Sequence, residues 1–286
     1  MTLEARGIVL AATPIGDTRD ASPHLRELLG SADLIAAEDT RRLRSLAGRL
    51  GVQISGRVVS FYDHNERSRL PILLEAARHG LVAVVSDAGQ PLVSDPGFPL
   101  VKAAIEAGIE LNCAPGPSAV LMALVLSGLP ATRFVFDGFV PRTAAGRRAW
   151  LDQIADERRT LVVFETARRL TQTLSDAAAR LGAERPAAIA RELTKPHQEV
   201  IRGPLAELAA MASARDLKGE ITLVIGGAER GAAPTASALA ELVDQVEGLV
   251  AGGDGLKPAV AAVAGPAELS KRALYAAVLA ARAADG

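Results

Sequence analysis

Short apolar runs alternate with segments of helical periodicity through the first half of the chain. Five such runs cover residues 7–12, 33–37, 57–61, 81–85 and 110–114. Apolar runs of this length are typical of strands buried on both faces of a parallel sheet, and the segments between them are long enough for crossover helices. The pattern therefore predicts an α/β domain over residues 1–117, with a parallel sheet covered by helices on both faces.

The pattern is less regular over residues 118–227. Helices are expected at 143–157 and before Gly182, and strands at 133–139, 160–164, 187–190, 198–202 and 221–225. The last two segments suit paired, antiparallel strands. We therefore expect a second α/β domain with a mixed sheet, packed beside the first.

Residues 228–286 are expected to form a linker and a small helical unit. Residues 226–236 are rich in Gly, Ala and Pro, as linkers are. Helices are expected at 237–250, 256–264 and 270–283, the last with Ser270 as N-cap. The tail is locally basic, through Lys257, Lys271, Arg272 and Arg282. Two roles are equally compatible with this sequence. The tail is an appendage for packing or dimerisation, or it is a unit that contacts RNA.

The composition limits the classes of function that the protein can have. The 286 residues are 49% hydrophobic and 23% charged, as in a soluble globular protein. The net charge is −1, so a polyanion would have to meet a local basic patch. The single cysteine, Cys113, excludes an intrachain disulfide and is expected to be a small buried hydrophobe. No signal peptide or spanning segment is evident, which places the protein in the cytoplasm.

The stretch SDAGQPLVSDPGFPLV, residues 86–101, is the strongest candidate site. It follows the central strand at its carboxyl end, which is where open α/β sheets bind ligands. Asp87 is placed to accept hydrogen bonds from an amine or hydroxyl, and Gly89 and Gly97 allow close approach to the backbone. Ser118 follows Pro-Gly-Pro and opens a helix, where its hydroxyl and backbone N–H groups suit a carboxylate or ribose.

Several common enzyme motifs are absent. The sequence has no phosphate loop, no G-x-G-x-x-G and no H-E-x-x-H, and its four histidines lack metal-ligand spacing. Ser118 is not set in a G-x-S-x-G elbow, which argues against a serine hydrolase. The loops suit a small zwitterionic ligand that carries a sugar, but spacing alone does not define the reaction.

Eight stretches, in order from about residue 8 to residue 227, resemble the tetrapyrrole methylase superfamily. They are ATPIGDTRD, AEDTRR, DHNE, SDAGQPLVSDPG, APGPSAV followed by SGLP, FDGFVPR, ARELTKPHQEVIRG and GEITLVIGG. The resemblance implies a two-domain fold that binds S-adenosylmethionine, without a metal, in a cleft between the domains. It assigns the cofactor to Pro14, Gly16, Asp87, Ala88, Gly89, Leu92, Val93, Ser118, Ala119, Thr166, Leu193 and Gly219.

Within the superfamily the chain looks like the branch that acts on ribosomal RNA. The implied activity is 2′-O-methylation of a cytidine ribose in 16S rRNA, free or in the small subunit, by a homodimer. A ribose hydroxyl needs a general base, and the candidates lie in two polar clusters, 38–39 and 63–66. They are Glu38, Asp39, His64 and Glu66, with helix capping by Thr40 and Asn65 as the competing role.

The expected RNA contacts are basic residues beside the proposed cleft and in the tail. They are Arg41, Arg42, Arg142, Arg147, Arg148, Lys271 and Arg272, any one of which can instead be a solvated surface charge. Two other functions stay open. One is a tetrapyrrole C- or N-methylase, and the other is a non-catalytic module that binds RNA without the cofactor.

Overall fold

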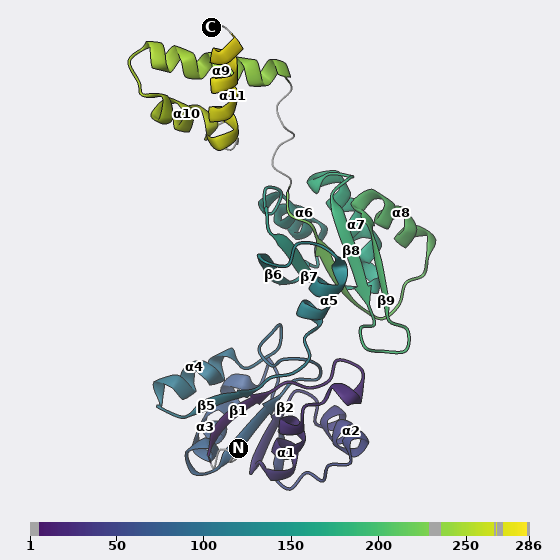
Figure 1. Ribbon diagram of the computed structural model, residues 1–286. Helices are drawn as coiled ribbons and strands as arrows, with labels where there is room; N and C mark the ends of the chain where they lie inside the picture. Colours follow the sequence, from purple (N-terminus) through teal and green to yellow (C-terminus); the bar gives the residue numbers. More distant parts are fainter. Residues whose placement is uncertain (1–5, 229–235, 266, 268–270, 285–286) are drawn as a thin grey trace. The chain divides into compact units, whose positions relative to one another are not determined.

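The computed structural model describes residues 6–228, 236–265, 267 and 271–284. Its contacts divide the chain into two compact units, one up to Gly226 and one from Gly227 onward. The first unit contains two five-stranded sheets, and the second is helical (Figure 1). A domain boundary at residue 117, within the first unit, stays a prediction.

The first sheet is wholly parallel, with strand order β3-β2-β4-β1-β5. Its strands are β1 Gly7–Ala11, β2 Leu34–Ala37, β3 Arg57–Ser60, β4 Leu81–Val85 and β5 Leu111–Ala114. Between them lie η1 Thr18–Asp20, α1 Pro23–Ser31, α2 Thr40–Leu50, α3 Glu66–His79 and α4 Phe98–Glu106.

Helices cover both faces of this sheet, as the apolar runs predict. On one face Leu28 of α1 and Leu46 of α2 pack against Ile35 and Ala83. On the other face α3 and α4 complete a second apolar cluster over the alternate residues of the same strands. The central strand β4 is buried at all five positions.

Local sequence explains where these helices begin and end. Ser22 caps α1 by accepting a hydrogen bond from the Leu25 N–H at 3.0 Å, and Pro23 occupies the first turn. Gly51 ends α2 in the left-handed conformation, with φ of 68°. Both ends agree with the sequence prediction.

The second sheet is mixed, with strand order β6-β7-β10-β8-β9. Its strands are β6 Phe134–Phe139, β7 Thr160–Thr166, β8 Pro186–Arg191, β9 Glu199–Pro204 and β10 Glu220–Ile225. Strands β6 and β7 are parallel, and the other pairs are antiparallel. One face is covered by α6 Ala144–Gln153, α7 Ala167–Leu181 and α8 Leu205–Ala214, and the other by α5 Ala119–Ser127.

Three details differ from the sequence prediction. Strands β9 and β10 do not pair with each other, because β8 lies between them and pairs with both. The helix expected to reach residue 157 ends at Gln153. Cys113 is exposed rather than buried, because β5 is an edge strand that pairs only with β1.

The second unit has a core of its own. Its helices are α9 Ala236–Ala251, α10 Leu256–Ala264 and α11 Lys271–Ala284, which agree closely with the expected segments. Val246, Leu274 and Val278 are fully buried at their contact. Ser270 and most of the expected linker lie outside the described residues. Within the described part of the chain, no helix combines the length and the apolar character needed to cross a bilayer.

Candidate functional site

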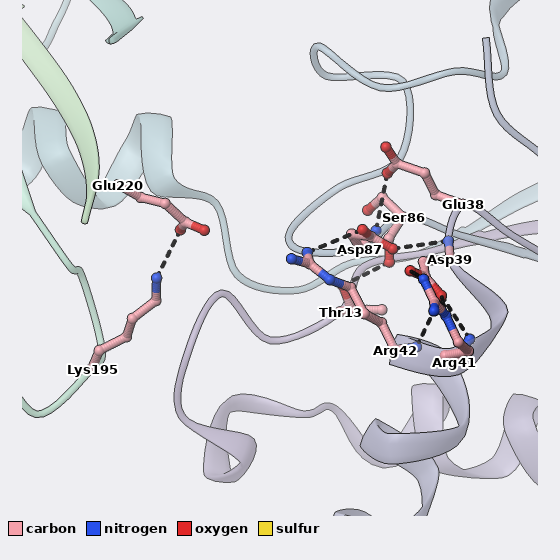
Figure 2. Close-up of polar contacts among 9 residues, drawn as sticks. All are labelled: Thr13, Glu38, Asp39, Arg41, Arg42, Ser86, Asp87, Lys195 and Glu220. Carbon is pink, nitrogen blue, oxygen red and sulfur yellow. Dashed lines mark hydrogen bonds and ion pairs between the residues drawn. The ribbon is translucent and has the colours of Figure 1, made fainter. Parts of the chain in front are cut away.

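Asp87 connects the carboxyl ends of β2 and β4. One carboxylate oxygen accepts the Asp39 N–H at 3.0 Å, and the other accepts Nη1 of Arg42 at 3.0 Å. The Asp87 N–H donates in turn to Oε2 of Glu38 at 3.3 Å, as Figure 2 shows. The carboxylate predicted to receive a ligand therefore also anchors α2 to the loop that follows β4.

The loops after β1 and β4 are bonded to each other. Thr13 and Gly89 exchange two backbone hydrogen bonds, at 2.9 and 3.0 Å. The buried Thr13 hydroxyl donates to the Ser86 carbonyl at 3.3 Å. Gly89 has a φ of 81°, a conformation that costs a glycine little. The backbone here is thus fixed at the point where the sequence predicts close approach by a ligand.

One cavity, called the main cavity here because most of the predicted cofactor residues line it, has a volume of about 410 Å³ and draws its lining from both sheets of the first unit. That volume is in the range of small-molecule sites. Nine of the twelve expected cofactor residues line it: Asp87, Ala88, Gly89, Val93, Ser118, Ala119, Thr166, Leu193 and Gly219.

Pro14, Gly16 and Leu92 do not line the main cavity. Pro14 and Gly16 line a neighbouring cavity of about 360 Å³, together with Asp87 and Ala88. The Leu92 side chain lies against Gly97 instead.

The lining of the main cavity fits a zwitterionic nucleoside. The first turn of α5, from its N-cap Ser118, borders the cavity, and exposed N–H groups at a helix start favour a carboxylate. Gly219, with φ of 94°, gives close access to the backbone. Phe139 and Phe164, whose ring centroids lie 5.3 Å apart, add an apolar wall.

The loop between β8 and β9 is hydrogen-bonded to the loop after β1. Thr194 accepts a hydrogen bond from the Asp17 N–H at 3.1 Å. Lys195 binds Glu192 at 3.0 Å and Glu220 at 2.9 Å, the second pair being drawn in Figure 2. Glu192 and Thr194 both have positive φ, a strained conformation for residues with side chains. These contacts fix the side of the cavity that Leu193 lines.

The four candidate bases occupy different environments. Glu38 lines the main cavity, where burial, followed by the charge of Asp87, raises the pKa of its carboxyl. Asp39 is the N-cap of α2, a role expected for Thr40, and hydrogen bonds from the Arg41 side chain and backbone lower its pKa. Only Glu38 of the four lies where a substrate in the main cavity would meet it.

Glu66 and His64 lie outside both cavities. Glu66 accepts the Gly97 N–H at 3.1 Å, which ties α3 to the start of α4. His64 is exposed and makes an edge contact with Tyr62, with ring centroids 6.4 Å apart. Asn65 precedes α3 as expected, but its carboxamide bonds Tyr62 and Ser60 rather than the helix.

The structure corrects one expected RNA contact. Arg147 is only 5% exposed, because it lies on the face of α6 that packs against α7, and two of its guanidinium nitrogens bind Asp176 at 2.7 Å. Arg142 and Arg148 are exposed nearby. Arg41 is exposed beside Asp39, Arg42 borders both cavities, and Lys271 and Arg272 are exposed in the second unit.

Sequence reasoning missed several residues of the main cavity. Asp95 lies in the candidate loop but was not named among the cofactor residues, and Phe139 and Phe164 are the last residues of two expected strands. The second acid of SDAGQPLVSDPG was a usable signal, whereas nothing in the sequence placed the two phenylalanines at the cavity. Among the described residues, no three His, Cys, Asp or Glu side chains are grouped to hold a metal ion.

Comparison with known proteins gives concordant matches. The family described as Tetrapyrrole (Corrin/Porphyrin) Methylases matches residues 7–209. A protein of Mycobacterium bovis named ribosomal RNA small subunit methyltransferase I is 53% identical over 98% of this chain and 96% of its own length. A Synechocystis protein of the same name is 41% identical over 94% of this chain and 95% of its own length.

Solved structures support the fold. The methyltransferase CobJ aligns with a TM-score of 0.60 and 20% identity over 80% of this chain and 98% of its own. Uroporphyrin-III C-methyltransferase from Thermus thermophilus, complexed with S-adenyl homocysteine, aligns with a TM-score of 0.54 and 21% identity over 77% and 97%. The chain belongs to the tetrapyrrole (corrin/porphyrin) methylase family, in the group whose members are named ribosomal RNA small subunit methyltransferase I.

Proposed function

We propose that this protein transfers the methyl group of S-adenosylmethionine to the 2′-hydroxyl of a cytidine ribose in 16S rRNA, in the cytoplasm. The observation that carries the proposal is full-length similarity, at 41–53% identity, to proteins named for ribosomal RNA methylation. The main cavity supports it, because its size and lining fit the methyl donor.

The cofactor would be held by residues of both sheets. Asp87, Ala88, Gly89 and Val93 form one side, and the start of α5 at Ser118 and Ala119 takes the carboxylate of the methionine part. Thr166, Leu193 and Gly219 close over the adenine, beside the two phenylalanines. Pro14 and Gly16 line the neighbouring cavity, and Leu92 lies against Gly97.

When bound, the sulfonium supplies an electrophilic methyl group. The chain's part is to hold the acceptor oxygen in line with that group and to exclude water, which together account for much of the catalysis in such displacements. A base must also take the hydroxyl proton. Among the four residues predicted from the sequence, Glu38 is the best supported for such a role, because it lines the main cavity and Asp39, His64 and Glu66 do not.

RNA would approach along exposed cations of both units. Arg41 and Arg42 lie at the start of α2, beside the cavity, and Arg142 and Arg148 flank the start of α6. Lys271 and Arg272 open α11 in the second unit. Each true phosphate contact adds to the salt dependence of binding, so alanine substitution there should weaken binding to all RNA sequences alike.

A homodimer is part of the proposal. Phe98 and Ile105 of α4, and Leu121 and Val125 of α5, expose between 53% and 73% of their surface in the single chain. Large apolar side chains that are exposed in this way are typical of protein interfaces. A second copy of the chain would cover them.

A donor-labelling assay tests the function. Purified protein is incubated with tritiated S-adenosylmethionine and either 16S rRNA or small subunits that lack the modification, and the labelled nucleotide is mapped by nuclease digestion. Label on a cytidine 2′-oxygen is expected. Label on a porphyrinoid instead would establish the tetrapyrrole methylase, and RNA binding that neither needs nor consumes the donor would establish the non-catalytic module.

A further inference from the structure

Tyr62 and His64 form an exposed pair of rings in the loop that joins β3 to α3. Their ring centroids lie 6.4 Å apart and their planes meet at 78°, so the edge of one ring contacts the face of the other. Tyr62 is 42% exposed, and His64 is exposed as well. The contact between the rings covers only one of their faces, so the pair presents ring surface to solvent.

The loop that carries the ring pair is held by hydrogen bonds. The Asn65 carboxamide accepts the Tyr62 N–H at 2.9 Å and donates to the Ser60 carbonyl at 3.2 Å. The Glu66 N–H donates to the Tyr62 carbonyl at 2.9 Å, and the Glu66 side chain accepts the Gly97 N–H at 3.1 Å. A surface that is already in place loses little conformational entropy when a ligand binds.

The ring pair lies at the same edge of the first sheet as the main cavity. Strands β2 and β3 are parallel neighbours, and the Phe61 N–H donates to the Ala37 carbonyl at 2.8 Å. Glu38, which lines the main cavity, follows Ala37, and Tyr62 follows Phe61. The two segments therefore leave the sheet about one strand spacing, roughly 5 Å, apart.

The charges beside the ring pair favour a base at the rings and a phosphate at α3. Asp63, between the two rings in the sequence, is exposed and has no partner among the described residues. Its carboxylate repels a phosphate but accepts a hydrogen bond from the exocyclic amine of a base. Arg67, in the first turn of α3, is an exposed cation that also has no partner in the described part of the chain.

The electrostatics of the cavity agree with this placement. Burial, followed by the charge of Asp87, raises the pKa of the Glu38 carboxyl, and the charge of Asp63 acts in the same direction. The loop with the ring pair is thus close enough to the main cavity to influence a residue of its lining. An RNA strand with one ribose in the main cavity has its next nucleotides within reach of this loop.

We propose that Tyr62 and His64 are a stacking platform for the base of an unpaired nucleotide beside the one that is methylated. Proteins recognise single-stranded RNA by stacking splayed bases on tyrosine and histidine rings, while cations hold the backbone. Arg67 holds the adjoining phosphate. His64 thereby acts in substrate binding and not as a general base. The inference rests on the proposed function, because it requires an RNA substrate.

The first test measures affinity for a single-stranded RNA fragment that contains the cytidine labelled in the donor assay. It compares full-length Tyr62→Ala, His64→Ala and Tyr62→Phe with Phe134→Ala, which removes an exposed ring of β6. We expect each alanine substitution in the platform to weaken binding, and to raise KM, by about 5- to 150-fold. Tyr62→Phe keeps the ring and binds as wild type, as does Phe134→Ala. Affinity for S-adenosylmethionine, measured by calorimetry, stays unchanged in all four.

The salt dependence of binding separates the rings from the cation. A stacked base releases no counterions, so Tyr62→Ala should leave the slope of log affinity against log salt at its wild-type value. Arg67→Ala removes one phosphate contact and should lower the magnitude of that slope by about 0.7, the value for one contact on a single strand. A slope altered by Tyr62→Ala, or unaltered by Arg67→Ala, would overturn the assignment of that residue.

Fluorescence of 2-aminopurine reports the stacking directly. The analogue is placed singly at each position that flanks the target cytidine, and its emission is quenched when the base stacks on a ring. Wild-type protein and Tyr62→Phe should quench the analogue at one flanking position, and Tyr62→Ala should not. Loss of fold alone would not reproduce this pattern, because affinity for S-adenosylmethionine is retained.

Contrary results distinguish this inference from the proposed function. Methyl transfer at an unchanged KM in Tyr62→Ala, or quenching that persists there, would refute the platform alone. A change in the mass of the particle in Tyr62→Ala would assign the rings to a contact between copies of the chain. RNA that is bound and quenched by wild type but never methylated would refute the proposed function and leave the platform standing. Failure of wild type to bind either the fragment or the unmodified small subunit would refute both.

Discussion

Oδ2 of Asp87 and Nη1 of Arg42 lie 3.0 Å apart, and this contact joins the loop after β4 to the first turn of α2. The same aspartate borders the main cavity and the neighbouring cavity of about 360 Å³. The ion pair therefore joins a residue predicted to bind the cofactor to one predicted to contact RNA.

Asp87→Ala should weaken S-adenosylmethionine binding at least tenfold by calorimetry. It also removes the acceptor of the partly buried Asp39 N–H and of the exposed Arg42 guanidinium, which should lower the unfolding free energy by about 1 kcal/mol, the usual net contribution of a hydrogen bond. Asp87→Asn keeps one acceptor oxygen and is the matched control for stability. Unchanged cofactor affinity in Asp87→Ala would remove this loop from the site.

Glu66 should behave as a positioning residue. Glu66→Ala removes the acceptor of the Gly97 N–H and should lower both stability, by about 1–3 kcal/mol, and kcat. Glu66→Gln retains an oxygen for that bond and should keep most of both. A general base would give the opposite pattern, with the glutamine variant as inactive as alanine.

Substitutions of Arg147 and Arg148 should distinguish a structural role from a role in RNA binding. Arg147→Ala breaks a buried pair with Asp176 and should cost about 3–5 kcal/mol in denaturant unfolding. Arg148→Ala is an adjacent, exposed control that should leave stability unchanged while reducing RNA affinity and its salt dependence. Equal unfolding midpoints for the two variants would contradict the burial of Arg147.

Asp95 should make stability fall as pH rises from about 4 to about 7. In that window the unfolded chain has released a proton that the folded chain retains, because burial raises the folded pKa to about 7. Asp95→Asn does not titrate, so its Tm should exceed the wild-type Tm above pH 7, and the difference should shrink toward pH 4. A difference independent of pH would show that Asp95 does not titrate in this range.

Val125→Asp should dissociate the proposed dimer. Val125 is 73% exposed in the single chain, and a carboxylate there would be buried without a partner in an interface. Light scattering after gel filtration should show the monomer mass for this variant and the dimer mass for wild type. Leu279→Asp, at an exposed apolar position of α11, is the control for added charge. A monomeric wild-type protein would refute the dimer.

The sequence predicted the first sheet well because its strands are continuous apolar runs bounded by clear helix caps. LVAVV is buried throughout, and Ser22 and Gly51 act as expected. Pairing in the second sheet was not predictable from periodicity, since alternation defines a strand's faces and not its neighbours. The position of β10 between β7 and β8 depends on the order of strands in the sheet, which the periodicity of the sequence does not report.

The sequence predicts the site well where a loop follows a predicted strand. It predicts the site less well where a side chain has several possible partners. The position of Asp87, Gly89 and Ser118 at one cavity follows from the parallel sheet and from resemblance to the family. Charge counting cannot tell the buried Arg147 from the exposed Arg148, because that depends on how α6 is rotated against α7. Cys113 was misjudged because an apolar run does not reveal that its strand lies at an edge.

The lining of the main cavity runs from Ile15 to Thr222, almost the full length of the first unit. During synthesis the ribosome releases the first sheet, with its loops, long before β10. A nascent chain that ends before residue 219 would still lack one wall of the cavity. The cavity is therefore complete only once β10 has been synthesised and has paired with β7 and β8.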